Sequence, residues 1–286
     1  MREVSRAIAQ PLPVPLGPTA RFLRRAWRWL QLNLIVIGAY LALLGVWQLA
    51  DLLFHVPRFL LPSPWEIIRR IAERPDKLAF HLAVTLQEVL IGFLIAVVVS
   101  IPSGILIVYS RVLERLIYPF LVAFQAIPKV ALAPILVVWF GFGLTSKISL
   151  ALVTAMFPIV LNTVVGMNQT PPEMIHLMRS LGASWLQIFL KVRLLAAAPH
   201  IFGGFKIGIT LAVVGAVVGE FIASNSGLGY FLLVANNGFD TPLLFGIVVI
   251  LSFVSIALFY VVELIEVLVL PGPLRKRTAA GAMRLT

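Results

Sequence analysis

The feature that most constrains this chain is a series of long apolar segments separated by short polar connections. A helix needs about 20 apolar residues to cross the hydrocarbon core of a bilayer. Six segments satisfy this requirement: about Leu32–Phe54, Leu82–Tyr109, Glu114–Phe140, Lys147–Met167, Ala196–Ile222 and Pro242–Leu270. The sequence therefore predicts an all-α integral membrane protein with six transmembrane helices.

Composition supports this assignment and excludes several other classes of protein. Hydrophobic residues make up 60% of the 286 residues and charged residues only 12%, whereas soluble domains have about 45–50% and about 25%. The chain has no cysteine, so it has no disulfide framework and no thiolate metal site. It also lacks the phosphate-binding and zinc-protease motifs. We expect one membrane domain over residues 31–270, a basic, proline-rich tail over residues 1–30 and a basic tail over residues 271–286.

The distribution of lysine and arginine predicts the orientation of the spans. Fifteen of these residues belong to the two tails and the second and fourth loops, and six belong to the other side. Because positive residues are enriched in cytoplasmic loops, both termini are expected in the cytoplasm of a bacterial cell, with the chain in the inner membrane. The net charge of +11 then reflects topology rather than binding to nucleic acid.

The cytoplasmic connection Thr170–Leu194 is built as an amphipathic helical pair. Thr170 and Glu173 have the spacing of a capping box, as do Ser184 and Gln187. Gly182 lies between them, where a left-handed helix end favours glycine. The sequence predicts a helix, a glycine turn and a second helix.

The apolar positions of this loop follow the spacing of one helical face. They are Met174, Leu177, Met178, Leu181, Trp185, Ile188 and Phe189. One interpretation is a docking surface for a partner protein. The other is a helix that lies on the lipid headgroups, although the glycine and the second cap argue against one continuous surface helix.

Polar residues inside the apolar segments are candidates for lining a transport path, because charges in a membrane are costly. These candidates are Glu88, Gln125, Lys129 and Glu220. Lys129 lies among three prolines that weaken a continuous helix, and it suits an anionic solute; Glu88 is a possible countercharge. The alternative is that a kink brings Lys129 to the surface, where its side chain reaches water.

The fifth apolar segment has small residues at every fourth position, which allows close helix packing in lipid. They are Gly204, Gly208, Ala212 and Ala216. Two outer connections also contain helix signals. Ser63-Pro64-Trp65-Glu66 predicts the start of a short helix, and Ser224–Asp240 is a glycine-broken loop with an apolar middle that can form a short helix at the membrane interface.

Several segments together carry a resemblance to a known family. They are the loop above, LPSPWEII (Leu61–Ile68), QAIPKVALAPILVVWFGFGLTSK (Gln125–Lys147), MFPIVLNTVVGM (Met156–Met167) and VVGEFIASNSGLGYF (Val217–Phe231). Over roughly residues 31–270 the chain resembles the membrane-spanning permeases of binding-protein-dependent ABC importers, in particular the sulfonate, taurine and nitrate permeases. This resemblance implies the type I ABC importer permease fold with a cytoplasmic coupling-helix loop.

The family's signature loop has the form E-A-A-x3-G-x9-I-x-L-P and docks into the ATPase subunit. Aligned on Gly182, this chain has His176-Leu177-Met178 at the E-A-A positions and Leu195 in place of the proline. A neutral or partly charged histidine weakens any ion pair that the glutamate makes. The residues that the resemblance places in the coupling loop are Glu173, His176, Leu177, Met178, Arg179, Ser180, Leu181, Gly182 and Ala183.

The resemblance also implies the partners and the mechanism. Two permease copies, expected to be identical, pair with two cytoplasmic ATPases and an external binding protein, with lipid around them. The chain holds no cofactor, since ATP and magnesium bind the ATPase. Two alternatives stay open: an ATP-independent channel or carrier, and a membrane-embedded enzyme. The enzyme is disfavoured because the four histidines lie far apart in sequence.

Overall fold

The computed structural model describes residues 34, 38–51, 53, 57 and 59–270. The chain divides into two units, Met1–Trp65 and Glu66–Thr286. In the first unit, residues 34, 38–51 and 53 are the described part of the predicted span Leu32–Phe54, and they are helical. The ends of that span and the predicted tails, 1–30 and 271–286, lie outside the described residues.

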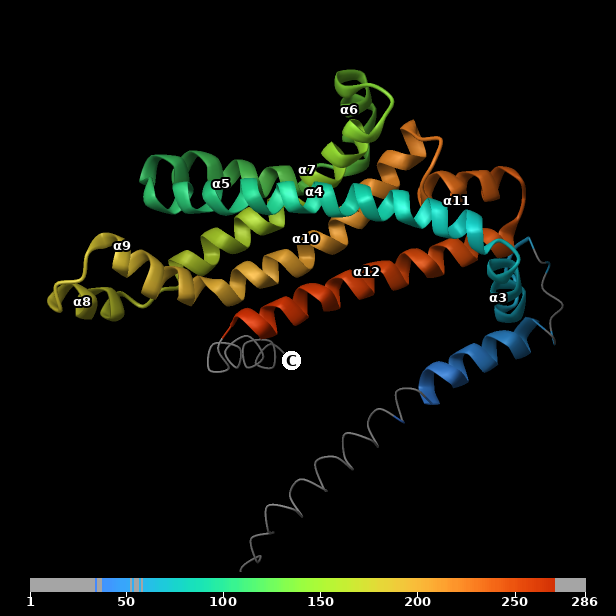
Figure 1. Cartoon of the computed structure of the whole chain (residues 1–286), viewed down its shortest axis with the longest axis horizontal. Coiled ribbons are helices and arrows are strands. Elements are labelled where there is room, and N and C mark those ends of the chain that lie inside the picture. Colours follow the sequence, from blue (N-terminus) through green and yellow to red (C-terminus); the bar gives the residue numbers. More distant parts are fainter. Residues whose placement is uncertain (1–33, 35–37, 52, 54–56, 58, 271–286) are drawn as a thin grey trace, which may run out of the picture. The chain divides into compact units, whose positions relative to one another are not determined.

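Four long helices form the body of the second unit (Figure 1). They are α4 (Pro75–Tyr109), α7 (Leu144–Asn168), α10 (Leu194–Ala223) and α12 (Thr241–Val269). Each is long and apolar enough to cross a membrane. These helices confirm four of the predicted spans. Their boundaries differ by at most three residues, except that α4 begins at Pro75 and the prediction began at Leu82.

The predicted third span, Glu114–Phe140, is wrong as a continuous helix. It consists of α5 (Arg111–Ala126), a 3-10 turn (Lys129–Leu132) and α6 (Ala133–Phe140), with a bend of 97°. The break occurs at Pro128, which has no N–H to donate and forces the preceding residue out of the helical region. Ile127 accordingly has extended angles, φ −69° and ψ 128°.

Shorter helices lie at the two ends of the long ones (Figure 1). At one end are α8 (Pro172–Ser180) and α9 (Trp185–Ile188), and a π-helix (Phe189–Arg193) joins α9 to α10. At the other end is α11 (Leu228–Asn237), which packs against α10 and α12. The helix predicted from Ser63-Pro64-Trp65-Glu66 is confirmed as α3 (Pro64–Ala72).

Helix α7 is the central element, because it packs against both α4 and α10. The contact with α10 uses the small residues at every fourth position. A Cβ on Gly204 would lie 2.9 Å from Asn162 Cβ, and a Cβ on Gly208 would lie 2.9 Å from Ile159 Cγ1. Ala212 and Ala216 are fully buried. The two helix backbones therefore approach more closely than larger side chains would allow.

We expect Gly215→Ala to destabilise the protein and Gly203→Ala to leave it unchanged or slightly more stable. A Cβ at Gly215 would lie 2.3 Å from Thr154 Oγ1 and 2.8 Å from the Leu150 carbonyl oxygen, whereas a Cβ at Gly203 meets no atom within 4 Å. Overpacking costs about 1–3 kcal/mol, while alanine otherwise favours a helix over glycine. Thermal unfolding of the two variants in detergent measures the difference, and equal midpoints would contradict the close packing described for α7 and α10.

Candidate functional site

The loop between α7 and α10 has a fixed local structure. Gly182 has φ +75°, a left-handed conformation that favours glycine, and it reverses the chain after α8. The capping box of α9 is confirmed: Gln187 N donates to Ser184 Oγ at 3.3 Å, and Ser184 N donates to Gln187 Oε1 at 2.9 Å. The predicted helix, glycine turn and second helix are therefore present.

The first predicted capping box, Thr170 with Glu173, is wrong. The residue before α8 is Pro171, and no side chain caps this helix. Thr170 is buried, and its hydroxyl donates instead to the Met167 carbonyl at 3.2 Å. The physical reason is that Pro171 and Pro172 carry no N–H, which leaves a threonine cap with few donors to accept from.

The predicted coupling residues lie on the surface of this loop. Two of them, Met178 and Ala183, are half-buried, and the others are exposed: Glu173, His176, Leu177, Arg179, Ser180, Leu181 and Gly182. Leu177 and Leu181 are 60% and 72% exposed, and with Met174 they follow one face of α8. A short helix with an exposed apolar face is suited to docking on another surface.

Aromatic and cationic side chains fix the base of the loop to α4. The rings of Tyr109 and Trp185 have centroids 5.2 Å apart, and Trp185 stacks on Phe189 at 5.8 Å. The guanidinium carbon of Arg193 lies 5.1 Å from the centre of the Tyr109 ring, within the range of a cation–π interaction. The loop is thus held to the end of one span and to the start of another.

At the opposite end of the long helices, three charged side chains are buried together. Lys147 Nζ on α7 lies 2.7 Å from Glu88 Oε1 on α4, and these side chains are 5% and 0% exposed. Glu88 Oε2 has no hydrogen-bond partner among the described residues. Glu220 on α10 is also fully buried, close enough to interact with Glu88. Buried charges in a membrane protein are usually paired and functional.

Side chains of this cluster hold the start of α11. Glu220 accepts hydrogen bonds from the Thr85 hydroxyl, at 2.6 Å, and from Gly229 N. Leu228 N donates to Thr85 Oγ1 at 2.8 Å, and Gly227 N donates to His81 Nδ1 at 3.1 Å. The first amide groups of a helix have no partner within the helix, and here α4 and α10 supply those partners.

Gly227 explains how α11 comes so close to Glu220. Its φ is +102°, and a Cβ would lie 2.1 Å from Glu220 Oε1. Only glycine combines this backbone angle with such a contact. The start of α11 therefore packs directly against the buried Glu220 carboxylate.

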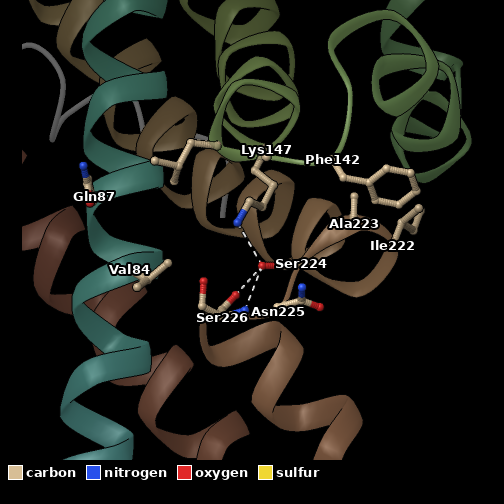
Figure 2. A pocket seen from close by; sticks show the side chains of 11 residues that line it. Val84, Gln87, Phe142, Lys147, Ile222, Ala223, Ser224, Asn225 and Ser226 are labelled. Carbon is tan, nitrogen blue, oxygen red and sulfur yellow. Dashed lines mark hydrogen bonds between the residues drawn. The ribbon is translucent and has the colours of Figure 1, made fainter.

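A cavity of 430 Å³ adjoins the charged cluster (Figure 2). It is lined from α4, from the turn before α7 and from the segment after α10. Lys147 points toward Ser224 within it and donates to Ser224 Oγ at 2.9 Å. Apolar and polar groups both face the cavity, among them Gln87, Phe142, Asn225 and Ser226.

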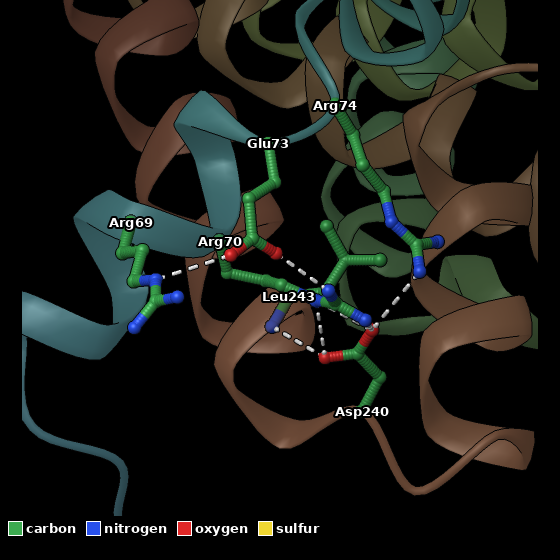
Figure 3. Close-up of polar contacts among 6 residues, drawn as sticks. All are labelled: Arg69, Arg70, Glu73, Arg74, Asp240 and Leu243. Atoms are coloured by element: carbon green, nitrogen blue, oxygen red, sulfur yellow. Dashed lines mark hydrogen bonds and ion pairs between the residues drawn. The ribbon is translucent and has the colours of Figure 1, made fainter.

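A second ionic group ties α3 to the start of α12 (Figure 3). Arg70 contacts both oxygens of Asp240, with distances of 2.5 to 3.1 Å, and it also pairs with Glu73 at 2.7 Å. Its hydrogen bonds to Asp240 and then to Glu73 raise the pKa of Arg70. The hydrogen bond from Arg70 lowers the pKa of Glu73, so this pair is intact at neutral pH and is lost as the pH falls through the lowered pKa of Glu73.

The structure brings together only two of the four predicted path residues. Glu88 and Glu220 are in the buried cluster, whereas Gln125 and Lys129 lie at the break between α5 and α6. Among the described residues Lys129 has no ion-pair partner, and the cation that pairs with Glu88 is Lys147.

Sequence reasoning misses Lys147 because it stands at the edge of its apolar segment, next to an outer connection. It also missed Thr85 and His81, which are unremarkable in a sequence. A usable signal existed: a buried acid in one span requires a basic partner in another, and Lys147 is one of few available.

Among the described residues no group of three or more histidine, aspartate or glutamate side chains could hold a metal ion.

Residues 89–273 match the model of a family described as binding-protein-dependent transport system inner membrane component. The riboflavin transport permease RibX of Chloroflexus aurantiacus is 38% identical over 90% of this chain and 96% of its own length. The formylaminopyrimidine transport permease ThiX of Halalkalibacterium halodurans is 36% identical over 81% of this chain and 93% of its own length.

The predicted branch is also represented among the relatives. The putative aliphatic sulfonate permease SsuC of Bacillus subtilis is 31% identical over 74% of this chain and 78% of its own length. Taurine and nitrate permeases are 28% and 31% identical. Among solved structures, an inward-facing MetNI methionine ABC transporter matches with a TM-score of 0.59 and 21% identity, over 73% of this chain and 99% of that chain. The predicted permease fold is confirmed.

Removing Lys147 should destabilise the protein more than removing the whole ion pair. Lys147→Met leaves Glu88 buried without its cation, which costs about 3–5 kcal/mol, whereas replacing both partners of a buried pair is often nearly neutral. We expect the double variant Glu88→Gln/Lys147→Met to recover most of the lost stability. Unfolding midpoints of the unsubstituted protein and the two variants in detergent measure this, and a double variant no more stable than Lys147→Met would refute the pairing.

Proposed function

Since the chain belongs to the family of inner-membrane components of binding-protein-dependent transport systems, and is an ABC importer permease, we propose that it forms the translocation path for a small polar solute by alternating access. The chain itself carries out no covalent chemistry. ATP and magnesium bind to a separate ATPase subunit, as in this family. The observation that carries the proposal is the exposed, rigidly held loop of α8 and α9.

We propose that this loop is the coupling surface for the ATPase. Its exposed apolar face, with Leu177 and Leu181, has no covering element in the second unit as described. A partner with an apolar groove would bury it. His176 is exposed beside these residues, and packing of the leucines then replaces the ion pair that a glutamate would make at this position.

The connection from the loop to the span is mechanically direct. Helix α9, the π-helix and α10 run without interruption from Trp185 to Ala223, over 39 residues. At 1.5 Å per residue this is a rod about 58 Å long. A displacement of the loop by the ATPase moves α10 along its length, and α10 carries Glu220, which holds α11. The loop and the buried cluster therefore lie at opposite ends of the continuous helix from Trp185 to Ala223.

The proposed assembly contains two copies of this permease, two ATPases and an external binding protein. Such a complex agrees with the family, and the solved relative is itself described as an ABC transporter. The loop faces the cytoplasm in this proposal, together with both termini, and α11 faces the outside of a bacterial inner membrane. The charge distribution of the sequence supports this orientation.

The class of solute is the finer part of the proposal. The sequence suggested a small anion, on the strength of Lys129. By their names, the relatives transport the nitrate anion and the zwitterion taurine, but also riboflavin and formylaminopyrimidine. These names support a small polar solute and leave its charge to be decided by the residues of this chain.

We expect single cysteines introduced by Ser180→Cys and Ala183→Cys to form disulfide cross-links with a cysteine-bearing ATPase, and the yield to change with ATP. The chain has no cysteine of its own, so any cross-link reports the introduced position. Ser180 is the last residue of α8, and Ala183 lies in the turn before α9. The yield in native membranes, with and without ATP, is the measurement.

Asn237→Cys, at the opposite end of the long helices, is the matched control and should not cross-link to the ATPase. Absence of cross-links at Ser180 and Ala183, with the permease folded and the ATPase present, would refute the coupling surface. That result would favour the ATP-independent carrier.

A further inference from the structure

A second cavity lies at the base of the loop between α7 and α10, where α4 ends and α5 begins. Figure 1 shows α8 and α9 at this end of the long helices. The volume of the cavity is 450 Å³, within the range of about 300–1,000 Å³ found for ligand pockets. Three arginines from three different elements line it: Arg111 from α5, Arg179 from α8 and Arg193 from the π-helix.

The charge that faces this cavity is entirely positive. No aspartate or glutamate is among the lining residues, and within the described part of the chain none of the three guanidinium groups has an ion pair or a hydrogen bond. By contrast, Lys147 and Lys206 in the same unit each pair with a glutamate. Membrane topology explains why basic residues are abundant at this end, but it does not require three of them to face one cavity. Because like charges repel, an anion between the arginines would stabilise the arrangement.

One of the arginines is already held in place for binding. The guanidinium carbon of Arg193 lies 5.1 Å from the centre of the Tyr109 ring, and Arg193 is half-buried. Stacking on a ring engages the face of a guanidinium and leaves its N–H groups available. Such a group can donate two parallel hydrogen bonds to the oxygens of a phosphate. The chemistry of the cavity therefore favours a phosphate-type anion.

The cavity lies at the depth of the lipid headgroups. Tyr109 is the last residue of α4, and Arg193 directly precedes α10, and both of these helices are long and apolar enough to cross a membrane. Tyrosine and tryptophan are enriched at membrane–water interfaces, and Tyr109 and Trp185 both line the cavity. Val108 and Ile188 also line it, so an apolar surface continues from the basic one. A phospholipid has both parts, whereas a free phosphate has only the charge.

The cavity is on the side of α8 that faces away from the exposed leucines. Ile175 and Arg179 are four residues apart and both line the cavity, which places them on one face of the helix. Leu177 is two residues from Arg179, or about 200° around the helix axis. A partner that docks on Leu177 and Leu181 therefore leaves the cavity open.

We propose that this cavity binds the headgroup phosphate of an anionic phospholipid. Arg111, Arg179 and Arg193 bind the phosphate oxygens, as in other basic pockets between transmembrane helices that hold anionic headgroups. The bound headgroup links the ends of α4 and α5 to α8 and so fixes the loop to the membrane surface. This proposal goes beyond the proposed function, since it requires only that the chain spans a membrane.

The test compares phosphatidylglycerol with phosphatidylcholine of the same acyl chains, in which a choline cation balances the phosphate. The permease–ATPase complex in neutral detergent is titrated with each lipid, and native mass spectrometry counts the lipids bound. We expect phosphatidylglycerol to bind about tenfold more tightly, because hydrogen bonds from arginine to an unbalanced phosphate are charge-assisted. Equal affinity for the two lipids overturns the proposal.

Variants locate the headgroup within the protein. Arg111→Gln and Arg179→Gln should each weaken phosphatidylglycerol binding about tenfold, the effect of one lost hydrogen bond to a charged group. Both residues are exposed, so the variants are expected to fold. Arg115→Gln is the matched control, because it removes an exposed arginine of α5 that does not line this cavity, and it should bind the lipid normally. Unchanged binding in both variants, or an equal loss in the control, overturns the proposal.

Two further measurements separate the lipid from other anions. Glycerol phosphate, at the same concentration as phosphatidylglycerol, should not displace the lipid; displacement would assign the cavity to a soluble anion. Arg179→Cys should not cross-link to the ATPase; cross-linking with the yield of Ser180→Cys would assign the cavity to the ATPase interface. Either of these results overturns the headgroup site.

The headgroup site and the coupling surface can fail separately. A complex that cross-links at Ser180→Cys in an ATP-dependent manner, and that does not prefer phosphatidylglycerol, refutes the headgroup site alone. A complex that prefers this lipid and does not cross-link at Ser180→Cys refutes the coupling surface alone.

Discussion

The fold depends on the close approach of α7 and α10. In a membrane the lipid is as apolar as the side chains, so burying leucine between helices contributes little, and packing at short distance must hold the bundle together. The small residues of α10 permit that distance. A Cβ added at Gly204, Gly208 or Gly215 would clash with α7, which shows how little space is left. Helix α4 packs against both α7 and α10, and the buried charges lie where the three helices meet.

Those buried charges set the second constraint, because each polar group must find its partner inside the protein. Lys147 and Glu88 pair across two helices, and Glu220 accepts hydrogen bonds from Thr85 and from the first turn of α11. The free N–H groups at the start of α11 and the Glu220 carboxylate of α10 are therefore hydrogen-bonded to each other. A polar cluster that would be costly in isolation becomes the anchor of α11.

The sequence predicted the elements that follow from local chemistry. Apolar length identified four long spans, the glycine and the capping box defined the turn before α9, and the proline at N1 marked the start of α3. The break at Pro128 was recognisable as a weak point, but its bend of 97° depends on how α6 packs back on α7. The capping box predicted at Thr170 does not form. The reason is local and visible in the sequence: two consecutive prolines follow Thr170.

The site was less predictable, because its members come from different helices. Glu88 and Glu220 were candidates as acids inside apolar segments, yet nothing in the sequence relates either to Lys147 or to His81. Those relations depend on the rotation of each helix about its axis, which the packing of small residues determines. The sequence leaves two interpretations of Lys129 open, in the transport path or at the surface, because it does not give the rotation of the helix that carries this residue.

The π-helix at Phe189–Arg193 has a consequence for how the loop and the span are aligned. A π-turn accommodates one more residue than an α-turn, and one residue corresponds to a rotation of about 100° around an α-helix. The extra residue therefore fixes the angular phase between the exposed face of α8 and the face of α10 that carries Glu220. A deletion of one residue here would keep every side chain of both surfaces and turn one surface away from the other.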